Sequence, residues 1–205
     1  MTTLIIARHG NTFGPNDTPT RVGGRTDLPL VESGHAQAEK IGAYLAENRL
    51  IPDVVYASHL KRTIETAEIA IKESGFRNPI FQLDIFNEID YGPDENKPED
   101  EVIARIGMQA IADWNESAVV PDGWDVNPDE IIKNWHDFAD QIRAHDDNET
   151  VLVVTSNGTA RFAPHIAGDF DGFRAKHPLK LSTGALAILK FNDNSWTVES
   201  WNIKP

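Results

Sequence analysis

Short apolar runs recur along the chain and predict the strands of a buried β-sheet. The runs lie at residues 4–7, 53–57, 81–86, 150–155, 183–191 and 195–201. A continuous apolar run of this length, bounded by turn residues, is typical of a strand that is covered on both faces. Asn192-Asp193-Asn194 separates the last two runs, which predicts an antiparallel hairpin at one edge of the sheet.

Apolar residues at helical spacing lie between these runs and predict helices. The helices are expected at residues 33–48, directly after Ser58, at 98–114, at 127–145 and from after Gly158 to about Ala167. Ser33 is the expected N-cap of the first helix, whose apolar face is Ala38, Ile41 and Leu45. Asn127 and Glu130 resemble a capping box at the start of the fourth.

The alternation of strands and helices predicts an α/β fold, a three-layer αβα sandwich around a mostly parallel central sheet. Residues 1–205 are expected to form a single domain. Residues 11–31 are rich in turn-forming residues and predict a long loop, which is often functional. Residues 92–126 interrupt the alternation and are interpreted as a helical cap insertion beside the sheet.

The charge and composition restrict the possible partners. The net charge of −13 disfavours binding to nucleic acid or to an anionic membrane. No apolar run approaches the roughly 20 residues of a membrane span, and the first residues lack the basic start of a signal peptide. The chain has no cysteine, so a thiol nucleophile and thiolate metal ligands are excluded. We expect a cytoplasmic protein.

Polar residues follow four of the predicted elements. They are Arg8-His9-Gly10, Ser58 with Arg62, Glu88, and Thr155-Ser156-Asn157-Gly158. The strands that end at Ala7, Ala57 and Thr155 should be adjacent and parallel, because ligands of such sheets bind beyond their carboxyl ends. Histidine can act as a nucleophile, and arginine can bind two phosphoryl oxygens. Taken alone, however, the first tripeptide is more typical of a surface salt bridge.

Several blocks in order along the chain resemble the histidine phosphatase superfamily, which is also called phosphoglycerate-mutase-like. The first is Leu4 to Thr12, with Arg8-His9-Gly10 at its centre. The others are residues 24–30 with Gly34, residues 56–63 with Thr66-Ala67, residues 87–92, and Val151 to Arg161.

The resemblance implies a role for each matching residue. His9 would accept the phosphoryl group, Arg8 and Arg62 would hold its oxygens, and Glu88 would protonate the leaving oxygen and then activate water. Thr12, Arg21, Gly24 and Asn157 would add substrate contacts. Without the motif, Glu88 would be one more acid in an acidic stretch. No metal and no cofactor are implied.

One position departs from the family pattern. The family places a second catalytic histidine directly after its last core strand, where this chain has Ser156. A serine hydroxyl supplies a neutral dipole in place of a positive charge, which predicts weaker stabilisation of the transferring phosphoryl group.

Four possible functions therefore remain open. The leading hypothesis is a phosphomonoester hydrolase that acts through a phosphohistidine on a small phosphorylated metabolite, with reduced activity. The alternatives are a non-catalytic protein that binds phosphate ligands, a phosphoglycerate-mutase-type phosphotransferase, and a serine hydrolase with Ser156 as nucleophile. The last is disfavoured because Val154 stands where a nucleophile elbow has glycine. The expected partner is a small phosphorylated substrate or phosphate, and a homodimer is left open.

Overall fold

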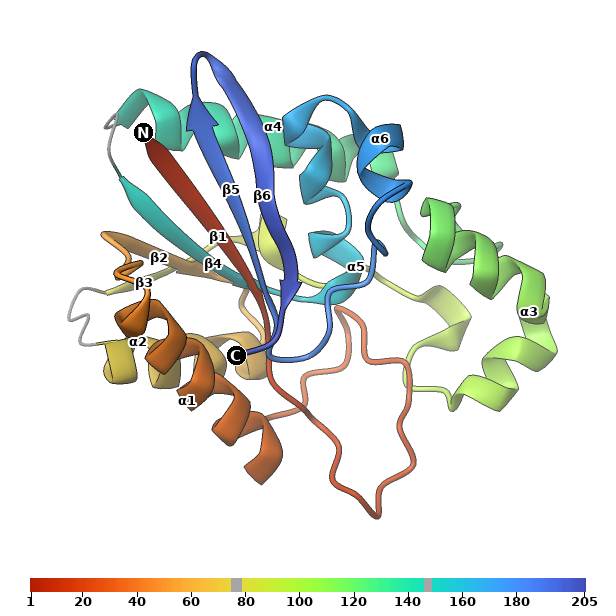
Figure 1. The fold of residues 1–205 in the computed structure, drawn as a ribbon. Helices are drawn as coiled ribbons and strands as arrows, with labels where there is room; N and C mark the ends of the chain where they lie inside the picture. Colours follow the sequence, from red (N-terminus) through yellow and green to blue (C-terminus); the bar gives the residue numbers. More distant parts are fainter. Residues whose placement is uncertain (75–78, 146–148) are drawn as a thin grey trace.

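A six-stranded sheet forms the centre of the computed structural model, which describes residues 1–74, 79–145 and 149–205 (Figure 1). The strands lie in the order β3-β2-β4-β1-β5-β6. Their bounds are Thr2–Arg8, Val54–Ala57, Ile80–Gln82, Thr150–Thr155, Leu186–Asn192 and Ser195–Ile203 for β1 to β6. Strands β3, β2, β4 and β1 are parallel, and β5 is antiparallel to both β1 and β6. The predicted mostly parallel sheet and its antiparallel edge are confirmed.

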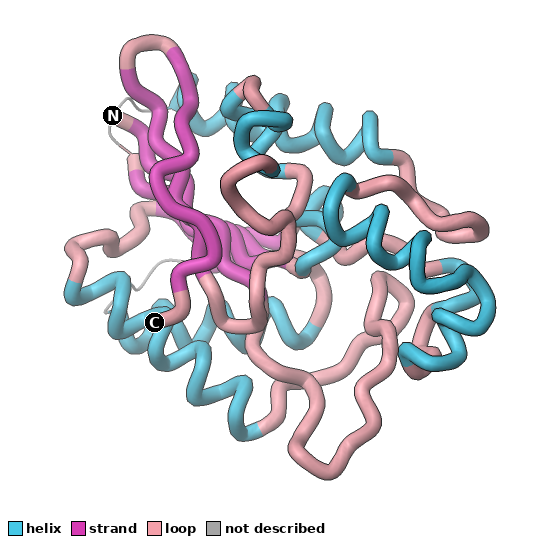
Figure 2. Tube along the Cα trace, turned by 45° about the vertical axis from the view of Figure 1, so that its right-hand side comes forward, coloured by secondary structure: helices cyan, strands magenta, loops and turns pink. Residues whose placement is uncertain are grey.

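The strands bury alternate side chains on the two faces of the sheet. Ile5, Ala7 and Val154 pack on one face against the apolar sides of α1 (Glu32–Glu47) and α2 (Lys61–Ser74). Leu4 and Ile6 belong to the other core, which includes residues of α4 (Pro128–His145) and the 3-10 helix η3 (Ala163–Ala167). Figure 2 shows the sheet with helices on both sides, so the predicted three layers are present.

Two local predictions were wrong at an end of the expected element. The expected strand at 81–86 ends at Gln82, and η1 (Asp84–Phe86) follows it. This turn buries Phe86, whose ring lies 4.9 Å from that of Phe138. The expected N-cap Ser33 lies inside α1, and Val31 occupies the N-cap without a side-chain hydrogen bond.

In place of the helix expected from after Gly158 to about Ala167, the chain forms two separate short helices. Helix α5 (Asn157–Ala160) stops after one turn, and η3 follows it. A proline ring excludes the carbonyl of the residue four positions earlier in a helix, and Pro164 stands four residues after Ala160. The short α6 (Phe170–Arg174) was not predicted, since five residues do not reveal a helical period.

Residues 92–126 lie beside the sheet and carry η2 (Gly92–Asp94) and α3 (Glu99–Ser117) (Figure 1). Helix α3 is kinked at Gly107, whose φ of 84° is a conformation that favours glycine. The buried carboxylate of Asp94 accepts hydrogen bonds from Arg105 and from Trp124 Nε1, which joins the two ends of the segment. Within the three described ranges, no helix is long and apolar enough to cross a membrane.

Candidate active site

The parallel strands bring the predicted polar motifs to one edge of the sheet. Arg8 pairs with Thr155 in the β1–β4 register, and Ala57 pairs with Val154 in the β2–β4 register. The strands that precede the motifs are thus adjacent and parallel, as predicted.

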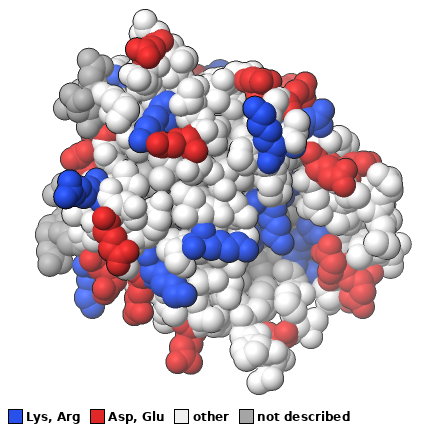
Figure 3. Space-filling view, viewed as in Figure 1, with Lys and Arg blue, Asp and Glu red and all other residues white. Residues whose placement is uncertain are grey.

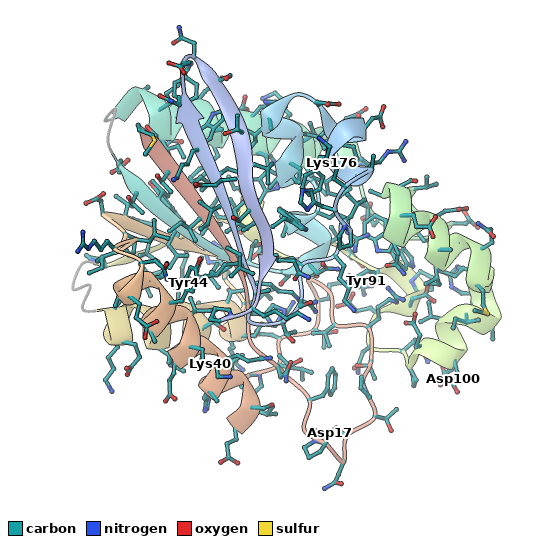
Figure 4. The ribbon with its side chains drawn as sticks, in the orientation of Figure 1. Asp17, Lys40, Tyr44, Tyr91, Asp100 and Lys176 are labelled. Atoms are coloured by element: carbon teal, nitrogen blue, oxygen red, sulfur yellow. The ribbon has the colours of Figure 1, made fainter. Side chains whose placement is uncertain are left out.

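A cavity of about 750 Å³ lies at this edge and takes part of its wall from the loop after β1. Figure 3 shows basic side chains gathered beside a hollow right of centre, and Figure 4 places Tyr91 between the sheet and α3. The wall includes six of the predicted residues, which are Arg8, His9, Thr12, Arg21, Glu88 and Asn157.

His9 is a buried histidine whose ring orientation is set by its own backbone turn. Its Nδ1 lies 2.7 Å from the carbonyl oxygen of Gly10. A carbonyl can only accept a hydrogen bond, so Nδ1 carries the proton and Nε2 of the neutral ring keeps its lone pair. Burial, together with the charges of Arg62 and Arg8, lowers the pKa of His9 well below its ordinary value. The ring is therefore neutral at neutral pH and has an available nucleophilic nitrogen.

Arg8 and Arg62 are held by backbone carbonyls and not by carboxylates. Arg8 Nη1 donates to Leu181 O at 2.9 Å, while Arg62 donates to Thr26 O at 2.8 Å and to Gly23 O at 3.2 Å. The Nε atom of each is buried and has no partner among the described residues. Burial lowers the pKa of both side chains, and the charge of Glu88 opposes that effect.

Arg62 is fully buried and is not among the residues of the cavity wall. Its backbone is linked to the turn that carries His9. The hydroxyl of Thr66 donates to the carbonyl of Arg62 at 2.7 Å and accepts the backbone N–H of Gly10 at 3.1 Å. Helix α2 thus connects Arg62 to the residue after His9. Unpartnered donors on arginines with this support can bind the oxygens of an anion.

Glu88 is oriented by two backbone donors. Its Oε1 accepts the N–H of Ile89 at 2.9 Å, and its Oε2 accepts the N–H of Gly158 at 3.1 Å. A Cβ atom on Gly158 would lie 2.3 Å from Glu88 Oε1, so only glycine leaves room for the carboxylate. Gly24 lies against the same segment. Its N–H donates to Ile89 O at 2.9 Å, and a Cβ atom added to Gly24 would lie 2.7 Å from Glu88 O.

Among the other residues predicted to bind substrate, Arg21 and Asn157 also support the cavity wall. Arg21 pairs with Glu99 at 2.6 Å and lies over the ring of Trp124 at 5.0 Å. Asn157 Oδ1 accepts the N–H of Leu181 at 2.9 Å. Thr12 lines the cavity, while Gly24 lies outside its wall.

Ser156 is fully buried at the end of β4, and its Oγ has no partner among the described residues. It is also absent from the cavity wall. Its φ of −114° and ψ of 166° are ordinary extended values, whereas a nucleophile elbow places its serine on a strained turn. The described contacts include no histidine at the hydroxyl, so the geometry lacks the base that a serine nucleophile requires.

The cavity wall also includes Trp114, which the sequence had suggested as a pocket residue, and side chains that were not predicted, among them Tyr91, Arg161 and Lys180. Arg161 is buried, stacks on Trp114 with 3.8 Å from its guanidinium carbon to the ring centre, and donates to Trp114 O at 2.7 Å. The only signal in the sequence was its place four residues after Asn157, one helical turn along α5. Within the described ranges, no three His, Asp or Glu side chains converge as metal ligands do, and the absence of a metal stays a prediction.

The comparisons with known proteins agree with this arrangement of fold and residues. The sequence profile of the histidine phosphatase superfamily (branch 1) matches residues 4–204. The chain therefore belongs to the histidine phosphatase superfamily, and the resemblance read from its motifs is confirmed.

Two relatives and one solved structure indicate the range of that superfamily. The chain is 28% identical over 205 residues to a 2,3-bisphosphoglycerate-dependent phosphoglycerate mutase of Bartonella quintana, covering 98% of this chain and 97% of the mutase. It is 36% identical over 122 residues to the corresponding mutase of Clavibacter michiganensis, covering 58% of this chain and 47% of that one. The match thus spans about half the length of several of these relatives. A mycobacterial glucosyl-3-phosphoglycerate phosphatase shares the fold with a TM-score of 0.80 at 17% identity, covering 99% of each chain.

Proposed function

We propose that this protein is a phosphomonoester hydrolase that acts through a phosphohistidine on a small phosphorylated metabolite. The observation that carries the proposal is the state of His9, a neutral ring with Nδ1–H bound to Gly10 O and Nε2 available beside two arginines. The unpartnered Nε atoms of Arg8 and Arg62 support it, because phosphoryl oxygens are strong acceptors for such donors.

In the proposed reaction, His9 Nε2 attacks phosphorus and the bond to the ester oxygen breaks. Glu88 gives its proton to that leaving oxygen, and a phosphohistidine remains. Water then attacks phosphorus, Glu88 accepts a proton from the water, and the bond to Nε2 breaks to release phosphate. The two backbone donors on Glu88 hold its carboxylate in one orientation through both steps.

A second candidate, phosphoglycerate-mutase-type transfer, is favoured by the names of the relatives. In that reaction the phosphohistidine would pass its phosphoryl group to a hydroxyl of a bound acceptor in place of water. A third, a binding protein without turnover, is favoured by Ser156, because the hydroxyl supplies no positive charge at a position where the family has histidine.

A screen of phosphorylated metabolites, with phosphate release as the readout and His9→Ala as the control, tests the proposal. We expect release by the wild type that His9→Ala abolishes, and an acid-labile phosphoprotein in quenched reactions of the wild type alone. Transfer of label to a second phosphoglycerate without phosphate release would identify a mutase. Binding of phosphorylated ligands with no turnover and no phosphoprotein would identify the binding protein.

A further inference from the structure

The cavity wall carries more positive charge than the proposed phosphoryl site uses. Its cations are Arg8, Arg21, Arg161 and Lys180, and its acids are Glu88 and Glu99. Arg21 is paired with Glu99, and Glu88 lies among the charges that act on Arg8. Arg161 and Lys180 have no carboxylate partner among the described residues, although the protein as a whole has a net charge of −13.

Arg161 is built into the wall as a rigid, buried cation. Its exposed fraction is 1%, Nη1 is bound to Trp114 O at 2.7 Å, and Nε lies 3.4 Å from Asn157 O. Its Nη2 has no hydrogen-bond partner within the described part of the chain. Glu88 acts on Arg161 as a neighbouring charge but does not pair with it directly. Burying a charge without a direct partner is costly, which points to a function for Arg161. Burial lowers the pKa of Arg161 to about 10, so the side chain stays charged at neutral pH.

Lys180 lies at the rim, on a segment that the site itself holds in place. The next residue, Leu181, donates its N–H to Asn157 Oδ1 and accepts Arg8 Nη1 at its carbonyl, both at 2.9 Å. Lys180 and Asn115 also line a second hollow of about 880 Å³, between the end of α3 and α6. The two hollows therefore adjoin at Asn115 and Lys180, so an extended leaving group at the first would lead towards the second.

We infer that the alcohol part of the substrate carries a second anionic group, a carboxylate or a further phosphate, which Arg161 and Lys180 bind. The inference rests on the proposed function, because it takes the phosphoryl group of the substrate to lie at His9, Arg8 and Arg62. A rigid guanidinium and a flexible ammonium at the rim suit an anion at the end of a chain of variable length.

Calorimetry on the wild type with phosphonates tests the inference, since a carbon–phosphorus bond is not cleaved by transfer to histidine. Three homologous series are compared at equal chain length, which are alkylphosphonates, ω-carboxyalkylphosphonates and α,ω-bisphosphonates. We expect the second anion to tighten binding by about tenfold or more at the best length. A larger increase in affinity for the ω-carboxyalkylphosphonates would indicate a carboxylate as the second anion, and a larger increase for the α,ω-bisphosphonates would indicate a phosphate.

Charge-removing variants locate the second anion. Lys180→Met should remove most of the affinity that the second anion adds and leave alkylphosphonate binding unchanged. Lys176 lines the second hollow alone, so the matched variant Lys176→Met should keep the affinity that the second anion adds. Arg161→Met should also remove most of the affinity that the second anion adds, and Arg161→Lys should retain part of it. Because Arg161 is buried, the melting temperature of its variants is measured, and the exposed Lys180 provides the test if they do not fold.

Each contrary result has a separate meaning. Equal affinities across the three series would overturn the inference, while alkylphosphonate binding that depends on Arg62 would leave the proposed function standing. An equal loss of all three series in Arg161→Met would assign Arg161 to the phosphoryl site and also overturn the inference. If no phosphonate binds the wild type, both proposals are wrong.

Discussion

His9 combines a buried imidazole with two nearby positive charges, and this has a consequence for stability as well as for chemistry. Its pKa is lowered in the folded protein by burial and by Arg62 and Arg8. The unfolded chain has the ordinary histidine value of about 6.5 and binds a proton first as the pH falls. The folded state is therefore penalised below that pH.

We predict that stability falls as the pH decreases from about 6.5 towards the lowered pKa of His9, and that His9→Asn reduces this fall. Urea unfolding of the two proteins at a series of pH values measures the effect. A wild-type slope equal to that of His9→Asn would show that His9 titrates alike in both states.

Ser156 supplies a second prediction at the scale of one residue. Its hydroxyl is buried and unpartnered at the end of β4, directly after Thr155, which pairs with Arg8. We expect Ser156→His to raise kcat by about tenfold or more, because a charged donor stabilises the transferring phosphoryl group more in the transition state than in the ground state.

Ser156→Asn, which adds a neutral side chain, is the control for this change and should give no such gain. Steady-state kinetics on a phosphomonoester that the wild type hydrolyses separates kcat from KM. A correctly folded Ser156→His protein that is no faster than the wild type would show that the side chain at position 156 does not contact the transferring phosphoryl group.

At the scale of elements, the approach of α5 to the segment after η1 decides where Glu88 lies. Gly158 N donates to Glu88 Oε2, and a Cβ on Gly158 would come within 2.3 Å of Glu88 Oε1 and 2.7 Å of Ile89 Cγ1. The carboxylate is the movable partner in this contact, because it is the end of a flexible side chain.

We predict that Gly158→Ala folds but displaces Glu88, and that it lowers kcat by about tenfold to a hundredfold with a smaller change in KM. Gly14→Ala is the control, since its added Cβ would meet Asp17 Oδ2 at an ordinary 3.4 Å. Kinetics and a melting temperature for each variant distinguish the two outcomes. Unchanged kcat in a stable Gly158→Ala protein would contradict the role proposed for Glu88.

At the scale of the whole molecule, the proposed site is a local group of cations on a strongly acidic protein. A ligand that binds only the folded state stabilises it by RT ln(1 + [L]/Kd), or about 2.7 kcal/mol at a hundredfold excess over Kd. For a chain of this size that corresponds to a rise of about 5–10 °C in Tm.

We therefore predict that orthophosphate raises the Tm of the wild type and that chloride at equal ionic strength does not. Arg62→Ala should lose most of this rise, measured from its own Tm without phosphate. Arg143→Ala, a change at a half-exposed arginine paired with Asp140, should keep it. An undiminished rise in Arg62→Ala would remove Arg62 from the phosphate site.

Much of this architecture was determined by the sequence itself. Each central strand is an unbroken apolar run, and burial on both faces of a parallel sheet requires such runs, so the strands and their layering could be predicted. Arg8 ends a strand, His9 follows it and Arg62 stands at the start of a helix, but these neighbours alone were more typical of a surface salt bridge, and only the resemblance of the whole blocks to the superfamily nominated the three residues. Two predictions failed where a proline or a distant aromatic residue intervened: the helix expected to reach residue 167 stops at Ala160, and the strand expected to reach Phe86 ends at Gln82.

Only the tertiary structure decided what each side chain faces. Arg161 binds the carbonyl of Trp114, 47 positions away in the sequence, and Glu88 binds the N–H of Gly158, 70 positions away. Lys180 reaches the cavity because Leu181 is bound to Asn157 and Arg8. A local pattern records whether a residue is buried, since burial repeats with the period of the helix or strand. It does not record the partner, because packing brings distant segments together.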